Sequence, residues 1–386
     1  MPDPKPPPPS PPLLARLTGG LTGGLAPAGI ALSYALGAAG GLAGLTAGLP
    51  LGMLIGALIA TAVTATLGLR PFGHPVAVPQ KWRFVLVPVI GVAIGAYFPA
   101  DFLTLVRDWW PGLLALLLYV PAAQMLSYLL YRRLGGINRP TAYFAAMPGG
   151  FIEAIDMGER AGADMSMLVA LQFLRLILCI LCIPLGYALF FGQAVGSGAD
   201  IAAPGSDLPL GLQDAAILLA CAVIGWWGAH RLRLPAAVLI GPLAASAVAH
   251  AMGLTHASPP DWAILLTQWV MGSSLGARFS GFPRRQIAAA LGLSAISVLV
   301  VLALAGVMAL ALSGATGQSV PAVILALAPG GITEMSLVAL SLQIAVVFVT
   351  LHHLFRIVLA VLVARAGLAL FPSLLDCDDA ASDKGG

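Results

Sequence analysis

The sequence predicts an all-α, polytopic transmembrane protein, and three features of its composition lead to that fold class. Of the 386 residues, 59% are hydrophobic and only 9% are charged, whereas a soluble domain carries about 25% charged residues. The 45 glycines are small residues of the kind that lets helices approach each other closely in lipid. Several apolar stretches reach the ~20 residues that cross a bilayer as a helix.

The chain also repeats itself, with a shift of 181 residues that carries Pro148 to Pro329. Further pairs keep this register: Gly149 and Gly330, Gly150 and Gly331, Glu153 and Glu334, Arg175 and Arg356, and the patterns Gly91-x3-Gly95 and Gly272-x3-Gly276. Because chance does not keep one register over so many matches, we infer a tandem duplication. We interpret the two glycine patterns as sites of close helix packing.

Each repeat holds the same series of apolar segments, which we expect to be helices. They cover residues 25–48, 50–68, 84–98, 111–131, 140–157 and 165–190 in repeat 1, and 214–230, 234–253, 262–277, 286–313, 320–341 and 344–371 in repeat 2. The expected domains are a disordered Pro-rich tail (1–24), membrane repeat 1 (25–190), a periplasmic linker (191–213), membrane repeat 2 (214–371) and an acidic tail (372–386).

The placement of Lys and Arg predicts that the two repeats are inverted. Basic residues in short loops mark the cytoplasmic side of a membrane protein. If each repeat crosses the membrane about five times, with its Pro-Gly-Gly segment in a broken helix or a re-entrant segment, only Arg107 and Arg160 fall outside. Fifteen basic residues then fall inside: Lys5, Arg16, Arg70, Lys81, Arg83, Arg132, Arg133, Arg139, Arg231, Arg233, Arg278, Arg284, Arg285, Arg365 and Lys384.

Six crossings per repeat and parallel repeats would give a weaker bias, with 10 basic residues inside and 7 outside. We therefore expect a multi-pass protein of the bacterial inner membrane whose N- and C-termini lie in the cytoplasm. A cysteine placed near Gly205 in the linker should then react with an impermeant thiol reagent from the periplasm.

Polar groups within the apolar segments form two matched sets. Charges inside lipid are costly and mark functional sites. In each set an arginine lies downstream of a glutamate, and a polar residue lies three positions before the arginine on the same helix face. The candidate substrate- or ion-binding residues are Glu153, Gln172 and Arg175 in repeat 1, and Glu334, His353 and Arg356 in repeat 2.

The two Pro-Gly-Gly segments, 148–150 and 329–331, predict a helix break at membrane depth, since proline and paired glycines disfavour the helix. Each restarting helix presents free N–H groups and a positive dipole end. Interrupted helices at corresponding positions of inverted repeats indicate a transporter's binding site. The alternative is structural: each glutamate satisfies the N-terminus of its own helix, and each arginine neutralises a glutamate.

The sequence offers no metal or cofactor motif. The six histidines (His74, His230, His250, His256, His352 and His353) show no recognised ligand spacing. We expect no metal, no cofactor and no catalytic residue, and the net charge of +3 is too small and dispersed for nucleic-acid binding. The expected partners are the lipid bilayer and a small molecule or ion, protons included, with a homo-oligomer left open.

The repeated pattern of LPxxxLIG, GxxxGAxF and PGGxxE with a downstream arginine resembles the AbrB-type duplicated membrane protein family from about residue 25 to 371. The resemblance implies a duplicated helical membrane fold. It also brings two functional labels, regulator of gene expression and ammonia monooxygenase. The chain departs from the family's pattern in repeat 1, where Gln172 stands at the position of His353. A role of that histidine would therefore belong to one repeat only.

Three functions remain, in this order. The first is a secondary transporter or exporter of a small molecule, with a midplane site between the two broken helices and access that alternates as the two halves rock. Its glutamates would couple protons or cations, and its arginines would hold these carboxylates or bind an anionic substrate. The second is a membrane-bound sensor that affects gene expression indirectly. The third is a membrane monooxygenase, although the residues do not indicate an enzyme.

Overall fold

The computed structural model describes residues 22, 24–98, 106–191 and 210–371. Nearly all of the expected N-terminal tail, most of the linker and the acidic tail lie outside the described residues. All regular elements within the described ranges are helices. Six of them are long and apolar enough to cross a membrane, three in each repeat. The chain is therefore an all-α, multi-pass integral membrane protein.

The helices fall where the apolar segments predict them. Those of repeat 1 are α2 (Pro27–Thr46), α3 (Gly52–Thr66), α4 (Lys81–Gly95), α6 (Trp110–Gly135), α7 (Arg139–Ala146), α8 (Phe151–Arg160) and α9 (Met165–Phe191), with a 3-10 turn η1 (Pro71–Gly73). Those of repeat 2 are α10 (Leu212–Arg231), α11 (Ala237–Ala251), α12 (Asp261–Gly276), α13 (Arg284–Thr316), α14 (Val320–Leu327), α15 (Ile332–Ser341) and α16 (Val346–Leu370), with a turn η2 (Ala277–Phe279).

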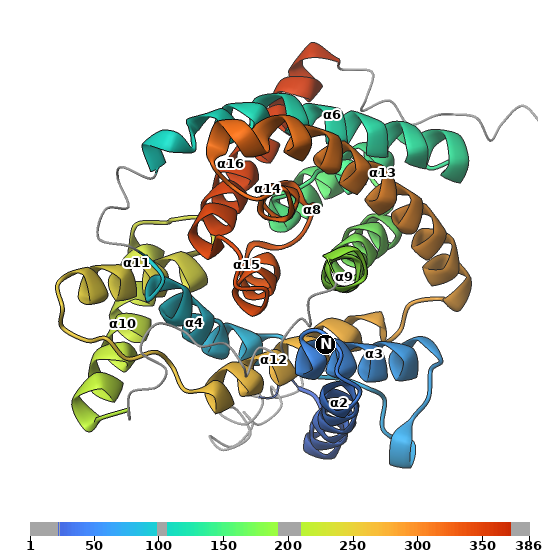
Figure 1. Cartoon of the computed structure of the whole chain (residues 1–386). Coiled ribbons are helices and arrows are strands. Elements are labelled where there is room, and N and C mark those ends of the chain that lie inside the picture. Colours follow the sequence, from blue (N-terminus) through green and yellow to red (C-terminus); the bar gives the residue numbers. More distant parts are fainter. Residues whose placement is uncertain (1–21, 23, 99–105, 192–209, 372–386) are drawn as a thin grey trace, which may run out of the picture.

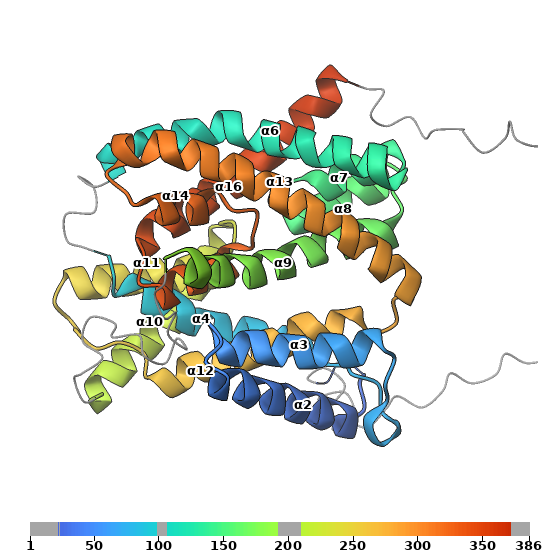
Figure 2. The same cartoon turned by 45° about the vertical axis from the view of Figure 1, so that its right-hand side comes forward.

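The helices form two layers (Figure 1). The first, which we call the glycine layer, contains α2, α3, α4, α10, α11 and α12, each of which packs on at least two others of the set. The second, which we call the broken-helix layer, contains α6–α9 and α13–α16. The turned view keeps this separation (Figure 2). Each layer takes helices from both repeats, so the sequence halves are not the packing units.

The halves interlace because two helices pack against the opposite repeat. Helix α4 lies on α11, and its counterpart α12 lies on α3. A methyl group added at Gly91 would lie 2.5 Å from the carbonyl oxygen of Leu239, and one at Gly276 would lie 2.6 Å from that of Leu58. Only glycine permits such close backbone approach, as the two Gly-x3-Gly patterns predict.

Both predicted helix breaks are present, at the Pro-Gly-Gly segments. Helices α7 and α14 each span eight residues and end one residue before the segment. Each begins with a proline in its first turn and a side-chain cap, in which Asn138 or Ser319 accepts a hydrogen bond from a backbone N–H. Helices α8 and α15 then restart after Gly150 and Gly331, and each spans ten residues.

The restarted helices differ in their surroundings. Nine of the ten residues of α15 are buried, but only two of the ten residues of α8 are. Helix α15 packs on α9 and on α4, and in Figure 1 it lies on the side of the broken-helix layer that faces the glycine layer. In the described part of the chain, α8 makes no comparable contact with α16 or α12, the repeat-equivalent helices. We call the buried α15 closed and the exposed α8 open. The two helices share the preceding Pro-Gly-Gly segment and the glutamate, but α8 carries Asp156, Glu159 and Arg160 where α15 has no charged residue.

Candidate functional site

A cavity of about 270 Å³ lies between the two layers, where both Pro-Gly-Gly segments meet. All six helix-break residues line it, together with Glu153, Gln172 and Arg175 of repeat 1. The glycine layer contributes Arg83, Phe84, Pro235, Ala236, Leu275 and Arg278. The structure thus brings together the two broken helices, as the sequence predicts, and places them against a face of the other layer.

Only one of the two predicted residue sets lines this cavity. The lining residues do not include Glu334, His353 or Arg356. All three are buried in the protein, with exposed fractions of 4%, 0% and 0%. The repeat 2 set therefore lies behind the cavity wall, in keeping with the closed position of α15.

Arg175 binds the end of the short helix α7. Its Nη1 donates to the carbonyl oxygen of Ala145 at 3.1 Å, and its Nη2 donates to that of Met147 at 2.7 Å. Gln172 supports the arrangement, because its Oε1 accepts from Nη2 of Arg175 at 2.5 Å and its Nε2 donates to the carbonyl oxygen of Phe144 at 2.8 Å. One guanidinium and one amide thus bind three carbonyl groups, those of Phe144, Ala145 and Met147, in the last turn before the break.

The same arrangement recurs in repeat 2. The guanidinium of Arg356 donates to the carbonyl oxygens of Leu327, at 3.4 Å, and of Ala328 and Gly330. The imidazole Nε2 of His353 contacts the carbonyl oxygen of Leu325 at 3.0 Å. Each carbonyl at the end of a broken helix lacks an intrahelical donor, and the dipole there is negative. A buried arginine supplies hydrogen-bond donors to these carbonyls and a positive charge at the negative end of the dipole.

This geometry replaces the structural pairing of arginines with glutamates that the sequence left open. Within the described residues, neither buried arginine forms an ion pair with Glu153 or Glu334. The reason is that breaking a helix creates two ends. The arginines satisfy the carbonyl end of α7 and α14, whereas the glutamates belong to the N–H end of α8 and α15.

The glutamates lie over the N-termini of their own helices. A methyl group at Gly331 would meet Oε2 of Glu334, and one at Gly150 would lie 3.2 Å from Oε2 of Glu153. Both carboxylates thus lie near the positive end of a helix dipole, where a negative charge is stabilised. Glu334 is buried and Glu153 is exposed, so only Glu153 is open to an incoming ligand.

Sequence reasoning missed two lining residues, Arg83 and Arg278, because it assigned them to cytoplasmic loops. Arg83 lies in the first turn of α4, and Arg278 lies in η2 directly after α12. The guanidinium carbon of Arg278 is 4.2 Å from the centre of the Phe173 ring on α9, across the cavity between the layers. The available signal was the repeat itself, since Arg278 replaces Tyr97 of repeat 1 at the end of the GxxxGAxF pattern.

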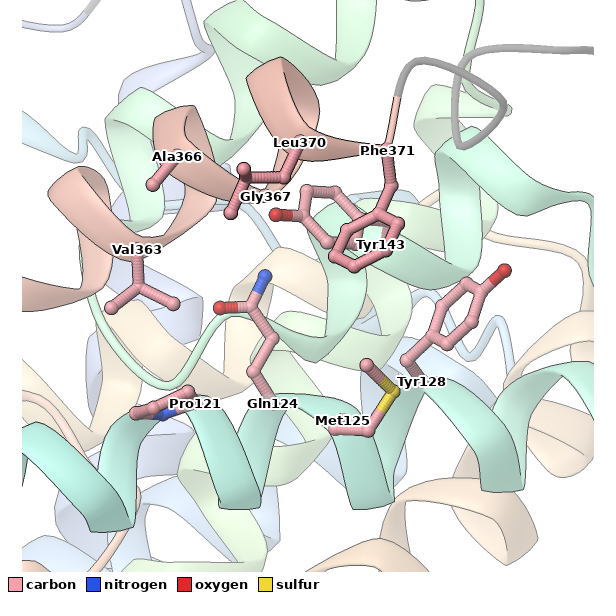
Figure 3. Close-up of a pocket in the computed structure, with 10 residues that line it drawn as sticks. All are labelled: Pro121, Gln124, Met125, Tyr128, Tyr143, Val363, Ala366, Gly367, Leu370 and Phe371. Atoms are coloured by element: carbon pink, nitrogen blue, oxygen red, sulfur yellow. The ribbon is translucent and has the colours of Figure 1, made fainter.

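A second cavity, of about 460 Å³, lies between α6, α7 and α16 (Figure 3). It contains none of the predicted site residues, and no charged residue lines it. The side chain of Gln124 points into it beside Tyr143 (Figure 3), and in the structure neither amide atom of Gln124 has a hydrogen-bond partner. In repeat 2, Ala305 stands at the position equivalent to Gln124.

No group of three or more His, Cys, Asp or Glu side chains lies close enough together to hold a metal ion, as far as the described residues go.

Taken together, the fold and the cavity define a class: a polytopic helical membrane protein with a small cavity at two broken helices. The sequence comparisons identify the family within that class. The family model "Transition state regulatory protein AbrB" matches residues 54–371, so the chain belongs to the AbrB family.

Two curated proteins are similar to this chain. The "Uncharacterized protein YhjN" of Bacillus subtilis (strain 168) is 24% identical over 214 residues, which cover 52% of this chain and 55% of that protein. The "Putative regulator AbrB" of Escherichia coli (strain K12) is 23% identical over 211 residues, which cover 54% of this chain and 59% of that protein. The matched region thus spans a little over half the length of each relative.

Proposed function

We propose that this protein is a secondary transporter whose substrate binds in the cavity between the glycine layer and the broken-helix layer. One observation carries the proposal: the helices that restart at the two equivalent Pro-Gly-Gly segments differ in burial, with α8 in an open position and α15 in a closed position. If the two repeats exchange these positions, α15 opens while α8 closes. The two states would then expose the same cavity to opposite sides of the membrane, as alternating access requires.

The side to which the cavity opens follows from the placement of arginines. Arg83 lies at the start of α4 and Arg278 directly after α12, and both line the cavity. The positive-inside rule assigns both of these helix ends to the cytoplasm. The structure therefore corresponds to an inward-facing state within this proposal. The inverted orientation of the repeats, with both termini in the cytoplasm of a bacterial cell, is part of the same proposal.

The residues at the cavity and behind its wall have different roles in this proposal. The arginines Arg175 and Arg356 stabilise the broken backbone, so that the Pro-Gly-Gly segments can keep free N–H groups next to a substrate without unfolding the helices. Glu153 is the exposed carboxylate at the cavity, and we propose it as the proton- or cation-coupling group in this state. Glu334 would take that role after the exchange, when α15 becomes the open helix.

Alternating accessibility of Ile152 and Thr333, which are repeat-equivalent, tests the proposal without a known substrate. Ile152 lines the cavity and is 74% exposed, whereas Thr333 lies on the closed helix α15. Single cysteines at these positions, in a background whose other cysteines are serine, are labelled with an impermeant thiol reagent in vesicles of both orientations. We expect labelling of position 152 from the cytoplasmic side and of position 333 from the periplasmic side.

The controls are cysteines at Gly281 and Gly205, which should label from the cytoplasm and from the periplasm in every condition. Gly281 lies in an exposed turn, and Gly205 lies outside the described residues. In a double-cysteine variant, a bulky label at position 152 should hold the open state and protect position 333. If position 333 never labels from the periplasm, the protein does not alternate, and the transporter proposal fails. Labelling of position 205 from the cytoplasm alone would contradict the inverted orientation.

The Escherichia coli relative is named "Putative regulator AbrB", and this name favours a second function. In that function the protein is a membrane sensor that controls gene expression through a partner. A sensor needs the same cavity but does not need both sides to open. Ligand binding together with labelling of the cavity from one side only would therefore favour this second function.

A further inference from the structure

The cavity between the layers carries positive charge that the protein itself does not pair. Three guanidinium groups line it, those of Arg83, Arg175 and Arg278, against the single carboxylate of Glu153. Within the described ranges, neither Arg83 nor Arg278 forms an ion pair. Partly buried charges without a partner are costly in a membrane protein, which suggests that a ligand supplies the missing negative charge.

Arg278 is positioned but not neutralised. Its Nε donates to Oε1 of Gln80 at 3.0 Å, and the same oxygen accepts from Oγ of Ser274 at 3.0 Å. Its guanidinium lies on the Phe173 ring, a favourable cation–π position. These contacts occupy one nitrogen and one face, so the terminal nitrogens keep the two-pronged geometry that binds a carboxylate or a phosphate.

Arg83 is held by fewer contacts than Arg278. Its Nε is buried and has no hydrogen-bond partner, and its guanidinium carbon lies 5.0 Å from the centre of the Phe84 ring. It also belongs to the first turn of α4, where the positive end of the helix dipole disfavours a cation. Its charge therefore adds to that of Arg278, with which it interacts unfavourably.

The other charged groups at the cavity do not cancel this field. Arg175 is hydrogen-bonded to α7, but its positive charge remains. Glu153 and Glu334 both lie over helix N-termini, whose partial positive charge offsets each carboxylate. Arg278 is attracted by Glu334, but the two do not approach within ion-pair distance. The net positive charge of the groups around the cavity therefore favours the binding of an anion.

The size and the remaining lining limit the kind of anion. A volume of about 270 Å³ equals that of roughly nine water molecules at ~30 Å³ each, so the ligand is small. Leu176, Leu275, Ile332 and Ile357 supply an apolar wall beside the arginines. An inorganic ion would leave this wall in contact with water, whereas an organic anion with a short apolar body would cover it.

We infer that the cavity binds a small organic carboxylate, with Arg278 and Arg83 as the residues that select for the anion. The inference rests on the proposed function for its site, and it adds the class of substrate. It requires that the carboxylate meets the free guanidinium nitrogens and that its apolar part lies toward α9, α15 and α16.

Hexanoate is a suitable probe, since its roughly eight non-hydrogen atoms match the cavity. Binding to the purified full-length protein in lipid nanodiscs is measured by thermal stabilisation and by equilibrium titration, with hexylamine, hexanamide and inorganic phosphate as comparison ligands. We expect hexanoate to bind and the amine and the amide not to bind. Arg278→Gln and Arg83→Gln should each weaken hexanoate binding about tenfold or more, the usual loss for a charged hydrogen bond.

Arg285→Gln is the matched control, because Arg285 is exposed, lies near Arg278 in sequence and does not line the cavity. It should bind hexanoate like the wild type. Arg278→Lys, which keeps the charge but loses the planar fork, should bind with intermediate affinity, and it remains informative if the glutamine variant does not fold. Binding of hexylamine, of phosphate alone or of no ligand in the set would overturn the inference. So would equal hexanoate binding by wild type and both glutamine variants. Cysteine labelling at positions 152 and 333 needs no ligand, so it judges the transporter proposal separately.

Discussion

Gln172 and His353 make the same hydrogen bond in the two repeats, although their side chains differ. Nε2 of Gln172 lies 2.8 Å from the carbonyl oxygen of Phe144, and Nε2 of His353 lies 3.0 Å from that of Leu325. The two carbonyls occupy equivalent positions in α7 and α14. The two repeats therefore share a hydrogen-bond donor to the end of the broken helix, and this donor need not be an imidazole.

His353→Gln should accordingly be tolerated. The glutamine amide would donate to the Leu325 carbonyl, and its oxygen would accept from Arg356, as Gln172 accepts from Arg175. It would also remove the imidazole Nδ1, which is buried without a partner. We expect a change in stability of less than about 1 kcal/mol by thermal melting, whereas His353→Leu should cost about 1–3 kcal/mol because it leaves the carbonyl unsatisfied. A folded His353→Gln protein that has lost function would show that the histidine has a chemical role.

Arg356→Leu should be among the most damaging single changes. The guanidinium is fully buried and satisfies three carbonyl groups at the end of α14, so its loss leaves polar backbone groups without donors in an apolar environment. We expect a loss of about 3 kcal/mol or more in the free energy of unfolding. Arg365→Gln, an exposed arginine on the same helix, is the control and should melt like the wild type. Similar melting of both variants would refute the backbone role of Arg356.

Gly272→Ala should loosen the contact between α12 and α3. The added methyl group would collide with the backbone carbonyl oxygen of Leu54, which cannot move without shifting the helix. Such overpacking costs about 1–3 kcal/mol. Gly292→Ala, also in a helix but with no atom within 4 Å of the added methyl, should be neutral or slightly stabilising. Equal effects in thermal melting would indicate that the glycines matter for helix flexibility and not for packing.

Gln124→Leu should stabilise the protein. Both polar atoms of this amide lack hydrogen-bond partners, although only 3% of the residue is exposed, beside the apolar cavity of Figure 3. Replacing a buried unsatisfied polar group by an apolar one of similar size should raise the free energy of unfolding by about 1 kcal/mol. The measurement is thermal melting in the same lipid for wild type and variant. A lower melting temperature would reveal that the amide has a partner inside that cavity.

Local sequence accounts for much of the fold and for part of the site. The apolar segments, the two Gly-x3-Gly contacts and both Pro-Gly-Gly breaks could be predicted, because each depends on the chemistry of a few neighbouring residues. The partner of each buried charge could not be predicted. Arg175 and Arg356 were expected near the glutamates, but the carbonyl end of α7 or α14 is an equally strong acceptor that has no signature in the sequence.

The sequence by itself determined that the chain is a helical membrane protein and that its helices break at 148–150 and 329–331. These properties follow from hydropathy and from the backbone preferences of proline and glycine, which act within one segment. Only the tertiary structure decided that α4 and α12 cross to the opposite repeat, that α15 is buried while α8 is exposed, and that Arg83 and Arg278 face the cavity. Those properties depend on packing between segments that lie far apart in the sequence.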